Sequence, residues 1–291
     1  MNAKRGAEAP PCSDLVVQAE HLVREDLDVL LALTQAERVE PMTRGRCEAF
    51  RLSAPRQLGG VAEALAAANY DWASVPRERT LERVRLVAMD MDSTLITIEC
   101  VDEIADMMGI KPEVAAITAS AMRGEIDFRE SLARRVALLA GLPVAALERV
   151  YDERLRLSPG AERLLGTLRA IGARTLLVSG GFTFFTDRLQ ARLRIDCALS
   201  NVLEIRDGRL TGRLMGDIVD AQGKAAMFAM LADRCRGEDG IAVAIGDGAN
   251  DLPMLAAADV SVAYRAKPKL RAQATHAIDH CGLDAVLNLF A

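Results

Sequence analysis

Short apolar runs separated by helical stretches constrain the fold of this chain more than any other feature. Such runs occur at Val84–Met89, 174–178, 241–245 and 260–263. Each has the length of a buried strand, and helical sequence intervenes at Ala161–Ala170, 224–234 and 252–257. Strands that alternate with helices predict an α/β fold with a doubly wound, largely parallel sheet.

A hairpin and a helical insertion modify this pattern. Asp207-Gly208 stands between two extended segments, 201–206 and 209–213, and this dipeptide is a strong hairpin signal. Residues 102 to about 157 are polar with helical spacing. They lie between the first two strands, so we expect a helical segment inserted there.

The first part of the chain has a different pattern. After a loose tail at residues 1–13, the segment 14–75 predicts a small α+β domain with the order β-α-β-β-α-β. Its expected elements lie at 15–19, 24–33, 47–52, 61–68 and 70–75. A charged, proline-containing linker covers 76–82, and the larger domain then occupies 83–291.

Composition excludes several classes of protein. The net charge of −5 comes without a dense basic run, which argues against nucleic acid as a partner. Six scattered cysteines and three histidines show no zinc-ligand spacing, and a chain with its own core does not need a disulfide framework. No apolar leader or unbroken run of about 18 apolar residues is present. We therefore expect reduced thiols, no membrane partner and a cytoplasmic location.

Two acids follow the first strand of the larger domain. In the segment Asp90-Met91-Asp92-Ser93-Thr94, alternation places Asp90 and Asp92 on the same side of the chain. Open α/β sheets bind ligands at the carboxyl ends of their strands. Two carboxylates placed there repel each other unless a cation or a proton resolves the repulsion. A solvated acidic turn is the alternative interpretation of this segment alone.

Three further motifs fall at the expected ends of later strands. Ser179-Gly180-Gly181 offers a hydroxyl and close backbone N–H groups to an anion. Lys224 opens a helix, where its charge and the helix N-terminus both favour phosphate. The loop 246–251, G-D-G-A-N-D, could hold a hard cation. Each has an ordinary alternative: a turn, a surface lysine and an acidic loop.

Taken together, the motifs D-x-D-x-T, S-G-G, K and G-D-G-x-N-D resemble those of the haloacid dehalogenase-like phosphatase superfamily, over residues 84–280. The resemblance is closer still to the phosphoserine phosphatase family. It includes D-M-D-S-T-L-I-T-I-E-C at 90–100, M-R-G-E-I-D-F-R-E-S-L at 122–132 and S-G-G-F-T at 179–183.

The resemblance implies a mechanism. Asp90 is the nucleophile that forms an aspartyl-phosphate, and Asp92 is the acid and then the base. Mg²⁺ is bound by Asp90, Asp247 and the backbone carbonyl of Asp92. Because the free pKa of an aspartate is about 3.9, we expect the charge of Asp90 and partial burial to raise that of Asp92. Asp251 supports the metal or Lys224.

The resemblance also implies how O-phosphoserine, the expected small-molecule substrate, is bound. Residues 102 to about 157 form a small helical cap over the site. Glu99 binds the ammonium group and Arg135 the carboxylate. Ser179, Gly180, Lys224 and Asn250 bind the phosphate or the substrate. Met122 and Phe128 match the apolar contacts of the cap, with ordinary helix packing as the alternative.

Some questions stay open at this stage. The order of elements in 14–75 resembles small amino-acid-binding regulatory domains, yet a structural or dimerising role, and with it a homodimer, is an equal alternative. A phosphotransferase, or a broader phosphomonoesterase with the same chemistry, competes with the phosphoserine phosphatase. A non-catalytic sensor on the same fold is disfavoured, because Asp90, Asp92, Lys224 and Asp247 are all present.

Overall fold

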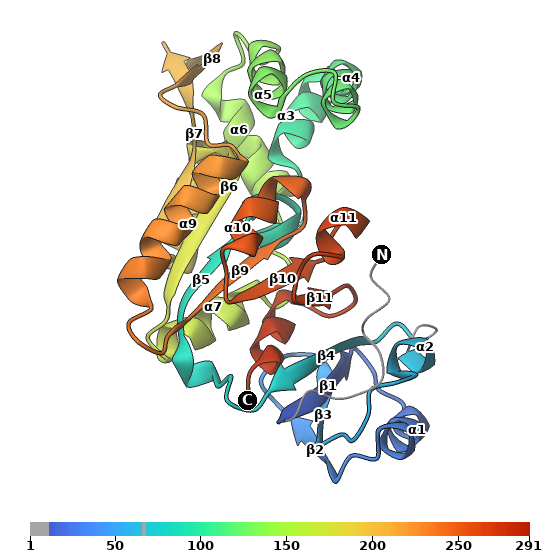
Figure 1. Cartoon of the computed structure of the whole chain (residues 1–291). Helices are drawn as coiled ribbons and strands as arrows, with labels where there is room; N and C mark the ends of the chain where they lie inside the picture. Colours follow the sequence, from blue (N-terminus) through green and yellow to red (C-terminus); the bar gives the residue numbers. More distant parts are fainter. Residues whose placement is uncertain (1–11, 66–67) are drawn as a thin grey trace.

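Two β-sheets, placed one above the other in Figure 1, organise this molecule. The computed structural model describes residues 12–65 and 68–291. A seven-stranded sheet has the order β11-β10-β9-β5-β6-β7-β8, and a four-stranded sheet has the order β2-β3-β1-β4. The strands are β1 Ser13–Ala19, β2 Arg38–Met42, β3 Glu48–Ser53, β4 Asp71–Pro76, β5 Val84–Met89, β6 Arg174–Phe182, β7 Cys197–Arg206, β8 Arg209–Met215, β9 Ile241–Gly246, β10 Val260–Tyr264 and β11 His276–Ile278.

Helices connect these strands and cover both faces of the larger sheet. They are α1 Arg24–Thr34, α2 Val61–Leu65, α3 Cys100–Met108, α4 Lys111–Met122, α5 Phe128–Ala137, α6 Val144–Arg149, α7 Ala161–Ala170, α8 Thr183–Leu193, α9 Ala221–Cys235, α10 Leu252–Ala256 and α11 Pro268–Arg271. Single turns lie at Leu81–Arg83, Met91–Leu95, Val150–Arg154 and Ala249–Asp251, and a longer 3₁₀ segment at Leu283–Leu289. Among the described residues, no helix is long and apolar enough to cross a membrane.

The central strand β5 shows why the sheet is covered on both sides. Its side chains alternate between the two faces, as a strand requires. Leu86 and Ala88 pack with the core of α9 and α10, whereas Val87 and Met89 pack with the core of α7 and α8. Every strand pair of this sheet is parallel except the β7–β8 hairpin. The predicted doubly wound sheet and the predicted hairpin are both confirmed.

The strand order places a crevice at the end of β5. This strand is first in the chain within its sheet, yet β6 pairs with it on one side and β9 on the other. Connections that leave in opposite directions open a crevice at the carboxyl ends of the strands. The insertion between β5 and β6, helices α3 to α6, stands at that end of the sheet in Figure 1.

The four-stranded sheet also packs with both of its faces. Leu15 and Val17 of β1 contact the core formed with α1 and α2, whereas Val16 between them joins the core of the larger sheet. The carboxylate of Asp71 in β4 accepts backbone N–H bonds from Asp279 at 2.8 Å and Cys281 at 2.8 Å, and from the residue between them. The small sheet is therefore attached to the end of the larger one by apolar packing and by a buried carboxylate.

The sequence pattern places most elements of the small sheet but not all of its strands. The predicted order β-α-β-β-α-β is the observed one. The pattern assigns no residues to β2, because its sequence R-V-E-P-M contains a proline and two charges. It is an edge strand, where proline is tolerated. The helix expected at 61–68 is described over Val61–Leu65, and residues 66–67 and most of the predicted tail lie outside the described residues.

Candidate active site

Asp90, directly after β5, is the centre of the site. Its side chain is 6% exposed. One carboxylate oxygen, Oδ1, accepts the Met91 N–H at 2.7 Å, and Oδ2 lies 2.8 Å from Lys224 Nζ and accepts the Asn250 side-chain amide at 3.4 Å. Burial and the nearby charge of Asp251 raise the pKa of Asp90 well above its ordinary value, against the opposing pull of Lys224. The carboxylate is thus fixed on both oxygens at the predicted strand end.

Lys224 reaches the site from the start of a helix, as predicted, and not from the end of a strand. It lies in the first turn of α9, whose start is capped by the Asp220 side chain. The Lys224 side chain is 1% exposed, and its Nζ bridges Asp90 Oδ2 at 2.8 Å and Asp251 Oδ1 at 2.9 Å. Burial disfavours the charged form, but these two carboxylates outweigh it and hold the pKa of Lys224 above its ordinary value.

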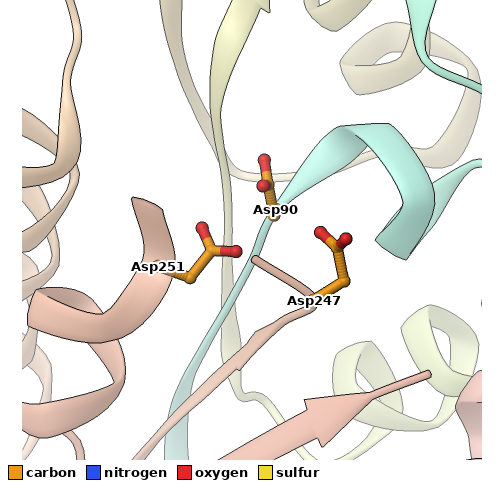
Figure 2. Close-up of side chains that lie close together, drawn as sticks. All are labelled: Asp90, Asp247 and Asp251. Atoms are coloured by element: carbon orange, nitrogen blue, oxygen red, sulfur yellow. The ribbon is translucent and has the colours of Figure 1, made fainter. Parts of the chain in front are cut away.

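Three carboxylates form a candidate metal site. Oxygens of Asp90, Asp247 and Asp251 lie within 4.8 Å of one another, and the side chains point toward a shared space (Figure 2). Both oxygens of Asp251 already have partners, Lys224 and the Gly248 N–H. The Asp247 side chain has no hydrogen bond to any described residue, and burial, followed by the charge of Asp251, raises its pKa to about 6. An oxygen-only donor set of this kind fits a hard divalent cation.

A tight turn brings Asp92 back over the site. Ser93 adopts a left-handed conformation with φ 56°, and Asp92 Oδ1 accepts the Cys100 N–H at 3.0 Å. Burial first, and then the negative charge of Glu99, raises the pKa of Asp92 to about 7. The predicted rise is present, but the charge that follows burial is that of Glu99 and not that of Asp90.

The Ser-Gly-Gly segment at the end of β6 borders the same space. Ser179 is buried, and its Oγ accepts the Gly181 N–H at 2.9 Å, which leaves its hydroxyl hydrogen free to donate. A Cβ atom on Gly181 would lie 2.9 Å from the Met91 side chain and 3.0 Å from Asp92 Oδ2. A side chain at this position would therefore displace the end of Met91 or crowd the carboxylate of Asp92.

The cap approaches from the opposite side. The Phe128 ring of α5 lies against Gly180, where an added Cβ would be 3.0 Å from it. Arg135, further along α5, is half-buried; burial lowers its pKa, and the charges of Asp102, Glu99 and Asp92 counteract this. Glu99 is exposed, and its carboxylate accepts the Ser93 hydroxyl at 2.7 Å. Glu99 and Arg135 thus both interact electrostatically with Asp92, and their roles in substrate binding stay predictions.

Two further residues of the cap helices, Met122 and Arg129, differ from what the sequence pattern predicts. Met122, at the end of α4, is 74% exposed and belongs to none of the apolar cores among the described residues. Arg129 of α5 is a contact that the sequence pattern does not predict, and its guanidinium donates to Asp220 Oδ2 at 2.7 Å. Since Asp220 also caps α9, this ion pair joins the cap to the helix that carries Lys224. The sequence signal for this ion pair is weak: Asp220 stands three residues before Gly223, a glycine within a helix.

Comparison with known proteins agrees with this geometry. Residues 87–256 match the family described as haloacid dehalogenase-like hydrolase. A phosphoserine phosphatase from Polaromonas sp. is 57% identical over 218 residues, covering 72% of this chain and 91% of that protein. The crystal structure of a haloacid dehalogenase family hydrolase from Salmonella enterica superposes with a TM-score of 0.85 at 33% identity, over 96% of this chain and 98% of that one.

A third match is the structure of a substrate-bound phosphoserine phosphatase complex. It superposes with a TM-score of 0.65 at 35% identity, over 72% of this chain and 99% of that one. The family match covers more than half of the chain, and the relative from Polaromonas sp. extends that match at high identity. The chain belongs to the haloacid dehalogenase-like hydrolases and, within them, to the phosphoserine phosphatase family.

Proposed function

We propose that this protein hydrolyses O-phosphoserine to serine and phosphate in a Mg²⁺-dependent reaction with an aspartyl-phosphate intermediate. The observation that carries the proposal is the arrangement around Asp90. Its buried carboxylate has Lys224 on one oxygen and lies beside Asp92, a carboxyl group with a pKa of about 7. A nucleophile, a cation and a proton donor are thereby gathered at one strand end.

Asp90 and Asp247, together with the backbone carbonyl of Asp92, are the proposed ligands of the metal. Asp247 is suited to this role because its carboxylate has no hydrogen-bond partner among the described residues. Asp251 is assigned a supporting role, since its two oxygens hold Lys224 and the Gly248 N–H. Bound Mg²⁺ would neutralise charge on the substrate phosphate.

Charge balance explains why this protein needs cations around Asp90. Two unit negative charges 4 Å apart repel by about 4 kcal/mol at an effective dielectric constant near 20, and a phosphate dianion increases that repulsion. Lys224 supplies a permanent positive charge on the approach to phosphorus. The Ser179 hydroxyl and the Gly180 N–H donate to the equatorial oxygens, and Asn250 adds an amide donor.

In the first step, an oxygen of Asp90 bonds to phosphorus while the ester P–O bond breaks. Asp92 gives its proton to the leaving serine oxygen. In the second step, Asp92 takes a proton from water as the water oxygen bonds to phosphorus, and the bond from Asp90 to phosphorus breaks. A pKa of about 7 suits both roles, because Asp92 is then about half protonated at neutral pH.

Recognition of the amino-acid part is assigned to Arg135 and Glu99. The planar guanidinium of Arg135 can bind both oxygens of the substrate carboxylate. Glu99 offers a carboxylate to the substrate ammonium group. Glu99 and Arg135 each interact electrostatically with Asp92, and this supports assigning them to the serine part of the substrate.

For residues 14–75 we propose a structural role as the primary one. The support is the buried Asp71 carboxylate on backbone N–H groups and the Asn288 amide, which donates to Gln18 Oε1 at 2.8 Å. This part of the chain completes the core at one end of the large sheet. Binding of an effector, or dimerisation, would be an additional role.

A phosphate-release screen tests the proposed activity. Purified protein is given phosphoserine, phosphothreonine and simple sugar phosphates, with Mg²⁺, after EDTA, and with Mg²⁺ restored. We expect phosphoserine to be preferred, EDTA to stop release and Mg²⁺ to restore it, while Ca²⁺ substitutes poorly because of its larger coordination shell. Full release in metal-free buffer would contradict the mechanism. Transfer of phosphate to added homoserine would instead identify a phosphotransferase.

A further inference from the structure

A buried asparagine joins two segments of the candidate active site. Asn201 lies in β7 and is 2% exposed. Its side-chain Nδ2 donates to the Gly180 carbonyl at 2.8 Å, and its Oδ1 accepts the Val219 N–H at 2.8 Å. The first partner belongs to the Ser-Gly-Gly segment at the end of β6, and the second directly precedes Asp220, the residue that caps α9. One side chain therefore connects the Ser-Gly-Gly segment to the helix that carries Lys224.

The ladder between β6 and β7 is irregular where Asn201 lies. Val178 of β6 pairs with Leu199 of β7. The next pair is Phe182 with Asn201, so β6 advances by four residues while β7 advances by two. The extra residues of β6 form a bulge, and a bulge leaves backbone groups without their partners in the ladder. The bulge contains residues 179–181, and the Asn201 amide supplies it with a hydrogen bond from β7.

Both partners of Asn201 are backbone groups with fixed hydrogen-bonding roles. The Gly180 carbonyl can only accept a hydrogen bond, and the Val219 N–H can only donate one. The side chain between them must offer a donor and an acceptor together, and an amide offers both without a charge. The two backbone segments are also close, since a Cβ added to Gly180 would lie 3.9 Å from the Val219 carbonyl oxygen. The amide therefore determines the spacing of these segments.

We infer that Asn201 is a positioning residue, which holds the Gly180 N–H and the start of α9 at the spacing that a bound phosphate group requires. This inference rests on the proposed function, in which the Gly180 N–H and Lys224 both bind the phosphate. The hydrogen bonds of Asn201 end on the backbone of Gly180 and of Val219, so it acts through these segments. A misplacement of about 1 Å by a residue far from the chemistry can cost roughly 100-fold in rate.

Binding of orthovanadate tests this inference without relying on turnover. Orthovanadate is an oxyanion that can adopt the five-coordinate geometry of phosphoryl transfer, and its affinity for the full-length protein with Mg²⁺ is measured by titration calorimetry. Asn201→Ala should weaken this binding by about 10- to 100-fold, because the donors to the equatorial oxygens are displaced. The value of kcat should fall by a similar factor for phosphoserine and for p-nitrophenyl phosphate, with a smaller change in KM, because both esters share the phosphate.

A matched variant separates positioning from stability. Thr186→Val removes another buried hydrogen bond to β7, the 2.7 Å contact between the hydroxyl groups of Thr186 and Ser200. Both Asn201→Ala and Thr186→Val should lower the melting temperature, since each leaves a buried polar group without its partner. Only Asn201→Ala should weaken the binding of orthovanadate. Wild-type affinity in folded Asn201→Ala, or equal weakening in the two variants, would overturn the inference.

Asn201→Asp provides a second test if the alanine variant does not fold. The new carboxyl group keeps the shape of the amide, but in its ionised form it can only accept, and the bond to the Gly180 carbonyl is lost. The orthovanadate affinity of this variant, relative to the wild type at the same pH, should be low at alkaline pH. It should recover as the pH falls and the carboxyl group gains a proton that it can donate.

A low relative affinity that persists at acid pH would overturn the role of Asn201. The proposed function fails in a different way. A wild-type protein that binds orthovanadate but releases phosphate from no ester would contradict the proposed activity alone. The comparison of the Asn201 variants with Thr186→Val would then still support or overturn the inference, because it measures binding.

Discussion

The two sides of the active site are built differently. On the sheet side, Asp90, Lys224 and Asp251 are almost completely buried and joined by contacts of 2.8 and 2.9 Å. On the cap side, Glu99 is exposed, and the only hydrogen bond described for the Arg135 guanidinium is one of 3.4 Å to the Ser131 carbonyl in its own helix. The groups assigned to chemistry are fixed, whereas those assigned to recognition still have free hydrogen-bonding capacity.

This difference follows from what each side must do. Charges that stabilise a transition state act best when they are already oriented and shielded from water. Groups that admit and release a substrate must exchange protein contacts for substrate contacts in each turnover. Substitutions on the sheet side should therefore affect every phosphate ester, and those on the cap side should affect mainly esters of the right shape.

The largest effect is expected for Asp90→Asn. An amide cannot form the acyl-phosphate, so phosphate release should fall on the order of 10⁴-fold or more for any ester. Lys224 keeps Asp251 as a partner, and the fold should persist in a thermal melt. Substantial release by the folded variant would show that the nucleophile is another group.

Arg135→Ala should separate recognition from chemistry. Loss of a charge-assisted contact to the substrate carboxylate should cost about 2–4 kcal/mol, or roughly 30- to 1,000-fold in kcat/KM for phosphoserine. Release from p-nitrophenyl phosphate, which lacks the carboxylate, should change little. Steady-state kinetics with both esters gives the comparison.

The neighbouring arginine provides the control for this variant. Arg134 lies on the same helix but pairs with Glu130 one turn away, at 2.5 Å. Arg134→Ala should leave the kinetics of both esters unchanged. Equal losses on the two esters in Arg135→Ala would mean that Arg135 serves the phosphate or the fold, and the cap side would then resemble the sheet side.

The pH profile tests how the two sides are coupled. Asp92 must be protonated to act as an acid, so kcat/KM for phosphoserine should fall as pH rises above about 7, the value to which burial and Glu99 raise its pKa. Glu99→Gln removes a negative charge and should move this alkaline limb to lower pH. An unchanged limb would show that Glu99 does not act on Asp92 and serves substrate binding alone.

The smallest effect is expected where cap and sheet side meet. Arg129 is 56% exposed in its pair with Asp220, and exposed ion pairs contribute little, so Arg129→Ala should reduce kcat/KM by no more than about five-fold. Added salt should lower kcat/KM of the wild-type protein toward the value of the variant, because salt screens the ion pair. A loss as large as that of Arg135→Ala would mean that closure of the cap depends on this one pair.

The sheet side could be predicted from the sequence because strand ends obey a general rule. Short apolar runs locate the strands, and parallel strands bring their carboxyl ends to one edge. Asp90 and Asp247 therefore meet although more than 150 residues separate them. The sequence also places Lys224 at the start of a helix, as observed, but the position of that helix beside the strand ends depends on how the chain returns from the β7–β8 hairpin.

The rest depends on backbone geometry that residue patterns do not encode. The influence of Glu99 on Asp92 arises because Ser93 takes a positive φ and turns the chain back. The pairing of Arg129 with Asp220 depends on how the cap docks.

The carboxylate of Asp71 has a consequence for anyone who would shorten this protein. The linker before β5 looks like a natural place to begin a smaller catalytic fragment. Such a fragment would lack the acceptor for three successive backbone N–H groups at 279–281, and would expose the apolar side of the strand next to them. A minimal enzyme would therefore need a redesigned loop at 279–281. The new loop would have to supply another acceptor, or turns in which those N–H groups form hydrogen bonds within the loop.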